Sequence, residues 1–234
     1  MESPHEINGQ LESRGMIGFL LASRNLHKAR EIRAILGDSY RYLTMRDVSG
    51  APYVDEDADT FAGNATKKAV ELAHWLDHAP PSALDARRST FYVLADDSGL
   101  EVDALNGAPG VHSARFASSD TVHSGNTPDA GNNTKLLRLL EGIPSEKRTA
   151  RFRCVLALVE AVPHAALPVP CLFEGVCDGR IGLAPRGRNG FGYDPLFIPE
   201  GYGQSFGELG DEVKNRLSHR ARALAALRDQ LSRR

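Results

Sequence analysis

A continuous apolar run at residues 16–22 (MIGFLLA) constrains the fold more than any other feature, because polar residues bound it on both sides. A run of this length and character is typical of a buried strand. Apolar residues then recur at helical spacing over residues 29–36, and Gly37 stands where a helix would end. The chain is therefore expected to open as strand, short loop and helix, which is the beginning of an α/β fold.

The remainder of the chain shows the same alternation, with strands clustering later. Helices are expected over residues 62–76, 133–141 and 213–231, the first of them capped by Thr60. Strands are expected at residues 40–44, 91–95, 152–159 and 172–176, and loops at residues 78–90, 118–133 and 184–199. The last loop keeps three aromatic side chains, which favours a binding loop over a plain linker. This order predicts an α/β protein with a mixed sheet.

Composition excludes several classes of protein. Hydrophobic residues make up 41% of the chain and charged residues 25%, which excludes a disordered protein. No run approaches the roughly 20 apolar residues of a membrane helix, so no membrane partner is expected. The net charge of −2 provides no general field for nucleic acid, which is not expected as a partner either.

The ends and the cysteines complete the expected organisation. Residues 1–15 are polar and are predicted to form a disordered N-terminal extension, followed by one domain over residues 16–234. The three cysteines, Cys154, Cys171 and Cys177, are odd in number and lack metal-ligand spacing. Reduced thiols in a cytoplasmic protein are the simplest interpretation.

The loop after the first strand has the character of a phosphate site. It comprises Ser23, Arg24, Asn25, Leu26, His27 and Lys28. A helix N-terminus attracts phosphate through free N–H groups and a partial positive charge, and Lys28 would add a full charge. The alternative is an ordinary capped turn with a solvated lysine, because the segment matches neither GxxxxGK[ST] nor GxGxxG.

Two acidic segments could hold a metal ion. Asp96 and Asp97 come directly after the strand expected at residues 91–95, and ligands in α/β sheets gather at the carboxyl ends of strands. Neighbouring residues on a strand point to opposite faces, so one carboxylate can face a cleft and bind Mg²⁺. The alternative is a surface acid pair in a turn. The run at residues 55–57 either adds a further carboxylate or forms a solvated loop.

The C-terminal third carries two more candidate segments. In the glycine-rich loop at residues 185–195, Phe191 could stack on a base and Asp194 could accept a hydrogen bond from a base N–H. The alternative is a hairpin loop whose aromatic residues fill the core. On the last expected helix, Lys214 and Ser218 share a face at i, i+4, with residues 219–220 beside them. A solvated basic face is the alternative there.

Five blocks, taken in order, resemble the inosine triphosphate pyrophosphatase family, the HAM1-like, house-cleaning pyrophosphatases of noncanonical purine nucleoside triphosphates. The blocks are ASRNLHK at residues 22–28, TFAGNATKKA at 60–69, ADDSGL at 95–100 with GAPGVHSARF at 107–116, GFGYDP at 190–195, and SHR at 218–220. The resemblance spans residues 17–231, nearly the whole chain.

The resemblance implies a long central mixed β-sheet flanked by helices in two lobes, with a nucleotide cleft between the lobes. It further implies a homodimer that uses Mg²⁺. The implied reaction cleaves ITP, dITP or XTP between the α and β phosphates, giving the monophosphate and pyrophosphate and keeping such nucleotides out of DNA and RNA. Two alternatives stay open: a non-catalytic purine-nucleotide sensor, and a related pyrophosphatase with another base preference.

The resemblance also implies a role for each matching residue. Asp97 would be the catalytic acid that binds metal and orients or deprotonates the attacking water, with Asp55 or Glu56 as the second metal carboxylate. The substrate-binding residues implied are Ser23, Arg24, Asn25, Leu26, His27, Lys28, Asn64 and Lys68 for the triphosphate, Ser98 beside them, and Phe191, Gly192, Tyr193, Asp194, Lys214, His219 and Arg220 for the purine.

The sequence departs from the family pattern in two of these blocks. Ser23-Arg24 stands for Thr-Gly, which keeps a hydroxyl. Gly63 stands for Glu, whose role would be either missing here or taken by Asp57 or Asp59. Donors from residues 219–220 aimed at the 6-oxo group would be left unpaired against the 6-amino group of adenine. A buried mismatch of that kind discriminates by about 10⁴ or more.

Overall fold

The structure is a computed structural model that describes residues 17–78, 91–120, 126–161 and 169–233. The extension predicted at residues 1–15 lies outside these residues, as does nearly all of the loop expected at 78–90. Among the described helices, none combines the length and apolar character needed to cross a bilayer.

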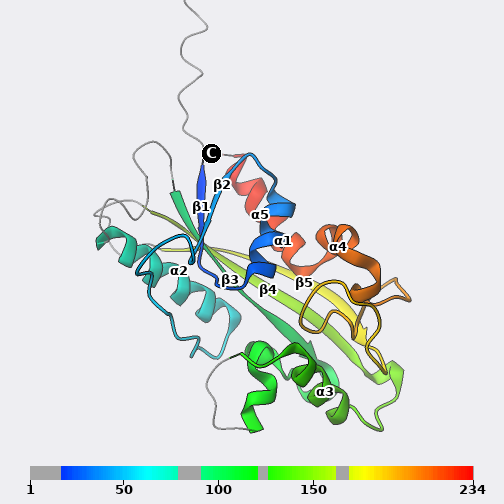
Figure 1. Cartoon of the computed structure of the whole chain (residues 1–234). Helices are drawn as coiled ribbons and strands as arrows, with labels where there is room; N and C mark the ends of the chain where they lie inside the picture. The colour runs from blue at the N-terminus through cyan, green and yellow to red at the C-terminus, as the bar shows by residue number, and fades with distance from the viewer. Residues whose placement is uncertain (1–16, 79–90, 121–125, 162–168, 234) are drawn as a thin grey trace, which may run out of the picture.

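A mixed sheet runs through the centre of the described chain, with six strands in the order β2-β1-β3-β4-β5-β6 (Figure 1). The strands are β1 (Gly18–Leu21), β2 (Arg41–Thr44), β3 (Phe91–Val102), β4 (Thr149–Glu160), β5 (Cys171–Ile181) and β6 (Phe197–Pro199). β1 is parallel to β2 and β3, whereas the pairs from β3 to β6 are antiparallel. The predicted mixed α/β sheet is confirmed.

Helices cover both faces of this sheet. They are α1 (Leu26–Leu36), α2 (Phe61–His78), α3 (Asp129–Leu139), α4 (Phe206–Leu217) and α5 (His219–Leu231), with 3₁₀ segments η3 (Asp103–Leu105), η4 (Gly110–Asp120) and η5 (Ser145–Lys147). α1 and α5 lie on one face and α2 on the other, while α3 and η4 form a second lobe at the far end of the long strands (Figure 1).

Local signals in the sequence explain where the first two helices begin and end. The Asn25 side chain caps α1 by accepting hydrogen bonds from the backbone N–H groups of His27 and Lys28. Gly37 ends the helix at φ +85°, a backbone angle that glycine adopts without a steric cost. The Thr60 hydroxyl accepts from Gly63 N–H at 3.0 Å, which confirms the predicted cap of α2.

Three apolar clusters hold the layers together. One lies between the sheet and α1 with α5, and includes Phe19 and Leu224. A second lies under α2, where Leu72 packs on the opposite sheet face. The third lies at the far end of the long strands and includes Leu136 of α3 and Phe206 of α4. The boundary between the two lobes therefore falls across the middle of β3 and β4.

The strand expected at residues 91–95 is much longer than predicted. β3 continues to Val102 because it pairs with β4 in unbroken register, with Asp96 opposite Leu156 and Asp97 opposite Val155. The acid pair therefore lies in the middle of a buried strand, and the expectation that it follows the strand was wrong. The tertiary pairing overrides the low strand propensity of aspartate.

The single C-terminal helix expected over residues 213–231 is two helices. Ser218 between them has extended backbone angles, and its hydroxyl accepts from Ala221 N–H, so it caps α5. The prediction that Lys214 and Ser218 share one helix face was therefore wrong. Gly175 of β5 allows α5 to approach closely, because a Cβ there would lie 2.0 Å from the carbonyl oxygen of His219.

The loop expected at residues 118–133 is shorter than predicted among the described residues. η4 extends to Asp120, and α3 begins at Asp129 rather than near residue 133. Asn132 explains the early start, because its side-chain oxygen accepts from Ala117 N–H at 2.8 Å and from the Thr127 hydroxyl at 2.6 Å. These contacts fix the first turn of α3 against η4.

Candidate active site

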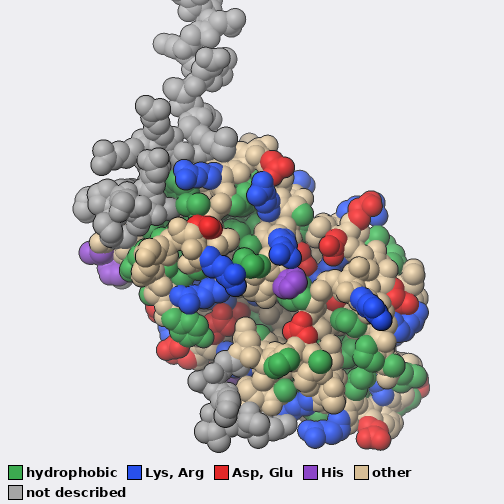
Figure 2. Space-filling view, in the orientation of Figure 1, with side chains coloured by type: hydrophobic (Ala, Val, Ile, Leu, Met, Phe, Trp, Pro, Cys, Tyr) green, Lys and Arg blue, Asp and Glu red, His purple; other side chains and the backbone are tan. Residues whose placement is uncertain are grey.

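A cavity of about 810 Å³ lies between the lobes, and Figure 2 shows basic and acidic side chains gathered around this hollow. Its lining includes the whole β1–α1 loop, residues 23–28, together with Asp55, Glu56, Lys68 and residues 96–98. The structure thus brings together, from four separate segments of the sequence, the residues predicted for the triphosphate and the metal, apart from Asn64, which is buried behind Asp97.

The β1–α1 loop is held in shape by its own side chains. The Ser23 hydroxyl accepts from Asn25 N–H at 3.1 Å, and Asn25 caps the helix as described above. Arg24 is exposed, donates to the Ala51 carbonyl at 3.4 Å and lies 5.9 Å from the centre of the Tyr53 ring. The loop therefore carries Arg24 against the segment that precedes α2, at the rim of the cavity.

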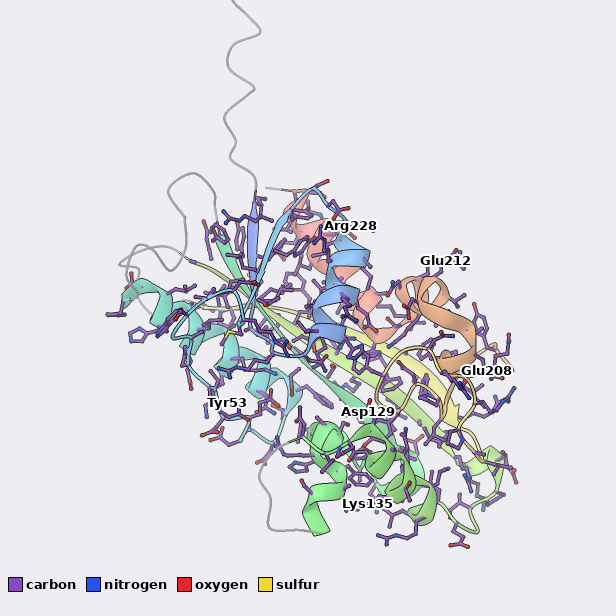
Figure 3. All side chains as sticks on the ribbon, in the orientation of Figure 1. Tyr53, Asp129, Lys135, Glu208, Glu212 and Arg228 are labelled. Carbon is purple, nitrogen blue, oxygen red and sulfur yellow. The ribbon has the colours of Figure 1, made fainter. Side chains whose placement is uncertain are left out.

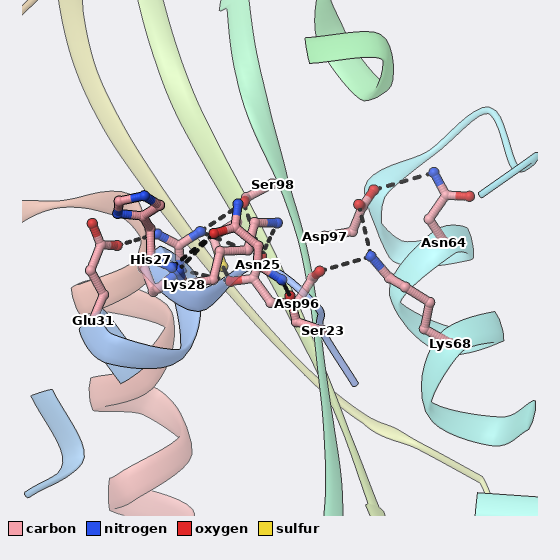
Figure 4. A network of polar contacts seen from close by, with 12 residues as sticks. Ser23, Asn25, His27, Lys28, Glu31, Asn64, Lys68, Asp96, Asp97 and Ser98 are labelled. Atoms are coloured by element: carbon pink, nitrogen blue, oxygen red, sulfur yellow. Dashed lines mark hydrogen bonds and ion pairs between the residues drawn. The ribbon is translucent and has the colours of Figure 1, made fainter. Parts of the chain in front are cut away.

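Asp96 and Asp97 face opposite sides of β3, as Figure 4 shows. Asp96 accepts from Lys28 Nζ at 2.6 Å, Arg220 Nε at 2.7 Å and the Ser98 hydroxyl at 2.9 Å. Burial opposes ionisation, but the charges of Arg220 and Lys28 hold the pKa of Asp96 well below its ordinary value. Asp96 is therefore a fixed anion that ties α1, β3 and α5 together.

Asp97 belongs to a different set of contacts. It accepts from Lys68 Nζ at 3.1 Å and from Asn64 Nδ2 at 3.2 Å, both from α2 (Figure 4). Lys68 also donates to Glu56 at 2.7 Å, so one ammonium group joins two carboxylates. Burial raises the pKa of Asp97 above its ordinary value despite Lys68, and the Glu56 carboxylate adds to the increase. A buried carboxylate of raised pKa is well suited to accept a proton.

Asp55 and Glu56 differ in burial and in contacts. Both line the cavity, but Asp55 is exposed, whereas Glu56 is half-buried and paired with Lys68. Arg115 of η4 donates to the Glu56 carbonyl at 2.8 Å and so fixes this segment against the second lobe. Of the two carboxylates that the sequence left open, Glu56 is the one held beside Asp97.

A second cavity of about 130 Å³ adjoins the first, and Lys28 and Ser98 line both. The residues proposed for the purine gather here: Phe191, Gly192, Tyr193, Asp194, Lys214, His219 and Arg220 all line it. The Phe191 ring stacks on His27 at 5.2 Å between centroids, and Lys214 Nζ lies 4.5 Å from the centre of the Phe191 ring. The stacking aromatic therefore lies directly across from the β1–α1 loop.

Buried charges surround this second cavity. Lys214 Nζ lies 2.6 Å from an oxygen of Asp194 and 2.6 Å from an oxygen of Glu31. Arg220 also pairs with Glu31 and donates to the Ser98 hydroxyl at 2.9 Å. Sequence reasoning missed Glu31, although its position three residues after Lys28 on α1 places the two on one helix face.

His219 is buried and stacks on Phe152, with 4.8 Å between centroids and 17° between planes. Its Nδ1 atom has no hydrogen-bond partner among the described residues. Burial, reinforced by the positive charges of Arg220 and Lys214, holds the pKa of His219 well below its ordinary value. The ring is therefore a neutral imidazole, which donates from only one of its two nitrogens.

The neutral His219 predicts a pH dependence of stability. Because its pKa is lower in the folded chain than the ~6.5 of an unfolded histidine, the unfolded state binds more protons below that pH. The free energy of unfolding should fall as the pH drops from 7.5 to 5.5, by up to about 1.4 kcal/mol per pH unit from this group. Urea titrations at the two pH values should show a smaller change in His219→Gln than in the exposed control His112→Gln. Equal changes in both variants would contradict a neutral buried His219.

The comparison with known protein families shows the family to which this chain belongs. The profile described as the Ham1 family matches residues 19–230. The chain belongs to the Ham1 family. The resemblance on which the sequence interpretation depended is thereby confirmed.

Curated Ham1 relatives are similar over nearly their full length. A dITP/XTP pyrophosphatase of Shouchella clausii (strain KSM-K16) is 42% identical over 91% of this chain and 95% of its own. A dITP/XTP pyrophosphatase of Pseudomonas syringae pv. tomato is 46% identical over 91% of this chain and 95% of its own. Among solved structures, a HAM1 protein from Coxiella burnetii has a TM-score of 0.74 at 35% identity, covering 94% of this chain and all of that one.

The donor set of this Ham1 chain fits a magnesium ion. Magnesium prefers carboxylate oxygens and commonly takes only one or two from the protein, with substrate phosphates completing its shell. Asp97 and Glu56 provide such oxygens at one wall of the cavity, and exposed Asp55 lies on the same lining. No group of three or more acidic, histidine or cysteine side chains suited to a metal occurs within the described parts of the chain. The residues therefore match an ion bound together with a phosphate ligand.

Proposed function

We propose that this Ham1-family chain is a house-cleaning pyrophosphatase that hydrolyses dITP, ITP and XTP to the monophosphate and pyrophosphate in the presence of Mg²⁺. The observation that carries the proposal is that the neighbouring residues Asp96 and Asp97 face opposite sides of β3 and contact different groups. Asp97 lines the larger cavity together with Lys68 and Glu56. Asp96 instead accepts a hydrogen bond from Arg220, which lines the smaller cavity beside Phe191. Relatives named dITP/XTP pyrophosphatase support the reaction.

The triphosphate is proposed to lie along the larger cavity. Lys28 and Lys68 line it and carry positive charge, and the Ser23 hydroxyl lies at the same loop. Asp97 accepts the proton of the attacking water, a role that its raised pKa favours. Mg²⁺ bound at Asp97 and Glu56 would supply charge neutralisation for the phosphates. Lys68 and Asn64 hold Asp97 in place for this step.

The purine is proposed to occupy the smaller cavity against Phe191. Four of the five N–H groups of Arg220 already donate to Asp96, Glu31 and Ser98, so the guanidinium has a fixed orientation. The neutral His219 and the one remaining N–H of Arg220 would face the 6-oxo group of hypoxanthine or xanthine. Fixed donors would be left unpaired by the amino group of adenine, which gives the basis for rejecting dATP.

Replacing Phe191 by alanine should raise the KM for dITP by about 5- to 150-fold, because stacking of a base on an aromatic ring contributes about 1–3 kcal/mol. Steady-state kinetics with pyrophosphate detection measures this effect. The matched control is Tyr202→Ala, which removes an exposed aromatic ring outside both cavities and should leave KM unchanged. An unchanged KM in Phe191→Ala would remove this ring from base binding.

A homodimer and a cytoplasmic location belong to the same proposal. All three cysteines are free, which supports a reducing compartment. Exposed apolar side chains at Val169 and Leu172 offer a surface near the start of β5 for self-association. Sedimentation equilibrium of the purified chain tests the dimer.

A further inference from the structure

The backbone of Gly192 is held from both sides by one helix. Its N–H donates to Asp129 Oδ2 at 2.6 Å, and its carbonyl accepts from Asn133 Nδ2 at 3.0 Å. Asp129 and Asn133 stand at i, i+4 on α3, so they share a helix face. Figure 3 shows Asp129 at the end of α3 that faces the middle of the molecule. Two side chains of the second lobe thus form hydrogen bonds to the backbone of the residue that directly follows Phe191.

The burial of Asn133 indicates that its hydrogen bond to the Gly192 carbonyl is a specific contact of the fold. Its side chain is only 8% exposed, and its Oδ1 atom has no partner among the described residues. A buried unpaired acceptor is unfavourable, so the amide is maintained for the bond that its Nδ2 makes. The opposite amide orientation would set Oδ1 against the Gly192 carbonyl oxygen, which also accepts only.

Gly192 in turn determines where Phe191 can lie. Its φ of +62° is a left-handed angle that glycine adopts freely, so the chain turns sharply just after the aromatic residue. On the other side, Phe191 N–H donates to Asp194 at 2.7 Å. With the turn fixed at both points, the Phe191 ring stacks on His27 and has the Lys214 ammonium group 4.5 Å from its centre.

We propose that Asp129 and Asn133 are positioning residues that set the Phe191 ring for the purine, acting through Gly192. This inference deepens the proposed function and depends on it for the identity of the stacked ligand. Because α3 belongs to the second lobe and His27 to the first, the two hydrogen bonds to Gly192 also fix how far the Phe191 ring lies from the first lobe. Neither residue lines the triphosphate cavity, whereas Asp129 lies on the lining of the smaller cavity beside Gly192.

The test compares Asp129→Ala and Asn133→Asp with the control Thr134→Ala. Thr134 is the exposed neighbour on α3, and among the described residues its hydroxyl donates to the Ala130 carbonyl of the same helix. Each test variant should raise the KM for dITP about tenfold, the effect of losing one hydrogen bond that involves a charged or buried group. Inorganic tripolyphosphate, which has no base, should inhibit all variants with the wild-type inhibition constant. Asp129→Asn should recover most of the affinity, because its amide oxygen still accepts from Gly192.

A second readout does not depend on nucleotide. In protein labelled with 4-fluorophenylalanine, the ¹⁹F resonance of Phe191, assigned through Phe191→Leu, should shift or broaden in Asp129→Ala and Asn133→Asp but not in Thr134→Ala. An unchanged resonance together with an unchanged KM would overturn the positioning role. An equal weakening of tripolyphosphate would overturn it too, since that result indicates general damage. If the wild type does not hydrolyse dITP, the proposed function fails, and the ¹⁹F comparison alone decides the positioning role.

Discussion

Replacing Asp97 by asparagine is expected to lower kcat for dITP by about 10²- to 10⁴-fold, the usual contribution of a positioned general base. Asparagine is nearly the same size and keeps an oxygen that can accept from Lys68 and Asn64. It has neither the negative charge for a metal ion nor the capacity to take a proton from water. The loss should therefore fall on kcat, while far-ultraviolet circular dichroism and the urea midpoint stay close to wild type.

The matched control is Asp103→Asn, at the first residue of η3 just after β3. Asp103 is an aspartate paired with Arg151 and Thr149 outside both cavities, so its replacement should leave kcat unchanged. Retained activity in Asp97→Asn, with the control also active, would mean that another acid performs the chemistry. Glu56 would then be the next residue to replace, because it shares Lys68 with Asp97.

Arg220→Ala is expected to cause the largest loss of stability, about 3–5 kcal/mol in the free energy of unfolding, as removal of one partner from a buried ion pair does. The Arg220 side chain is 1% exposed and pairs with Asp96 and Glu31. Alanine leaves both carboxylates buried with one fewer cation and opens a space beneath Phe191. Urea denaturation followed by circular dichroism measures the change.

Arg222→Ala provides the comparison for this loss. Arg222 lies on the same helix, but it is exposed and its contact is a hydrogen bond to the Val176 carbonyl. Its replacement should change the free energy of unfolding by less than about 0.5 kcal/mol, as is usual for surface positions. A loss below about 1 kcal/mol in Arg220→Ala would show that the pairs with Asp96 and Glu31 contribute far less than buried ion pairs ordinarily do.

The sequence predicted the first strand, the first two helices and the mixed sheet, because these elements have local signals. Residues 16–22 form an uninterrupted apolar run, and Asn25 and Thr60 are side chains that cap a helix. The length of β3 had no such signal. Aspartate is a poor strand former, and its place in β3 depends on pairing with β4 and on cations from α1, α2 and α5.

The site was predictable to the extent that its residues occur in contiguous blocks. The family resemblance placed Lys28, Lys68 and Asp97 in one site, and the structure brings them to one cavity. The sequence did not predict Glu31 as a site residue, because a lone glutamate on a helix is usually solvated. Its contact with Lys214 follows from the tertiary fold. The break between α4 and α5 at Ser218 was not predicted either, because helical apolar spacing continues without interruption through residues 213–231.

The measurement that tests the central claim most directly is pyrophosphate release from dITP, dATP and dGTP side by side, with and without Mg²⁺. We expect pyrophosphate from dITP only when Mg²⁺ is present, and little from the other two nucleotides. That result would establish both the bond that is cleaved and the selection of the base. Tight binding of dITP without turnover would contradict the claim and indicate a nucleotide sensor, and the absence of any binding would show that the chain shares the family's fold without its substrate.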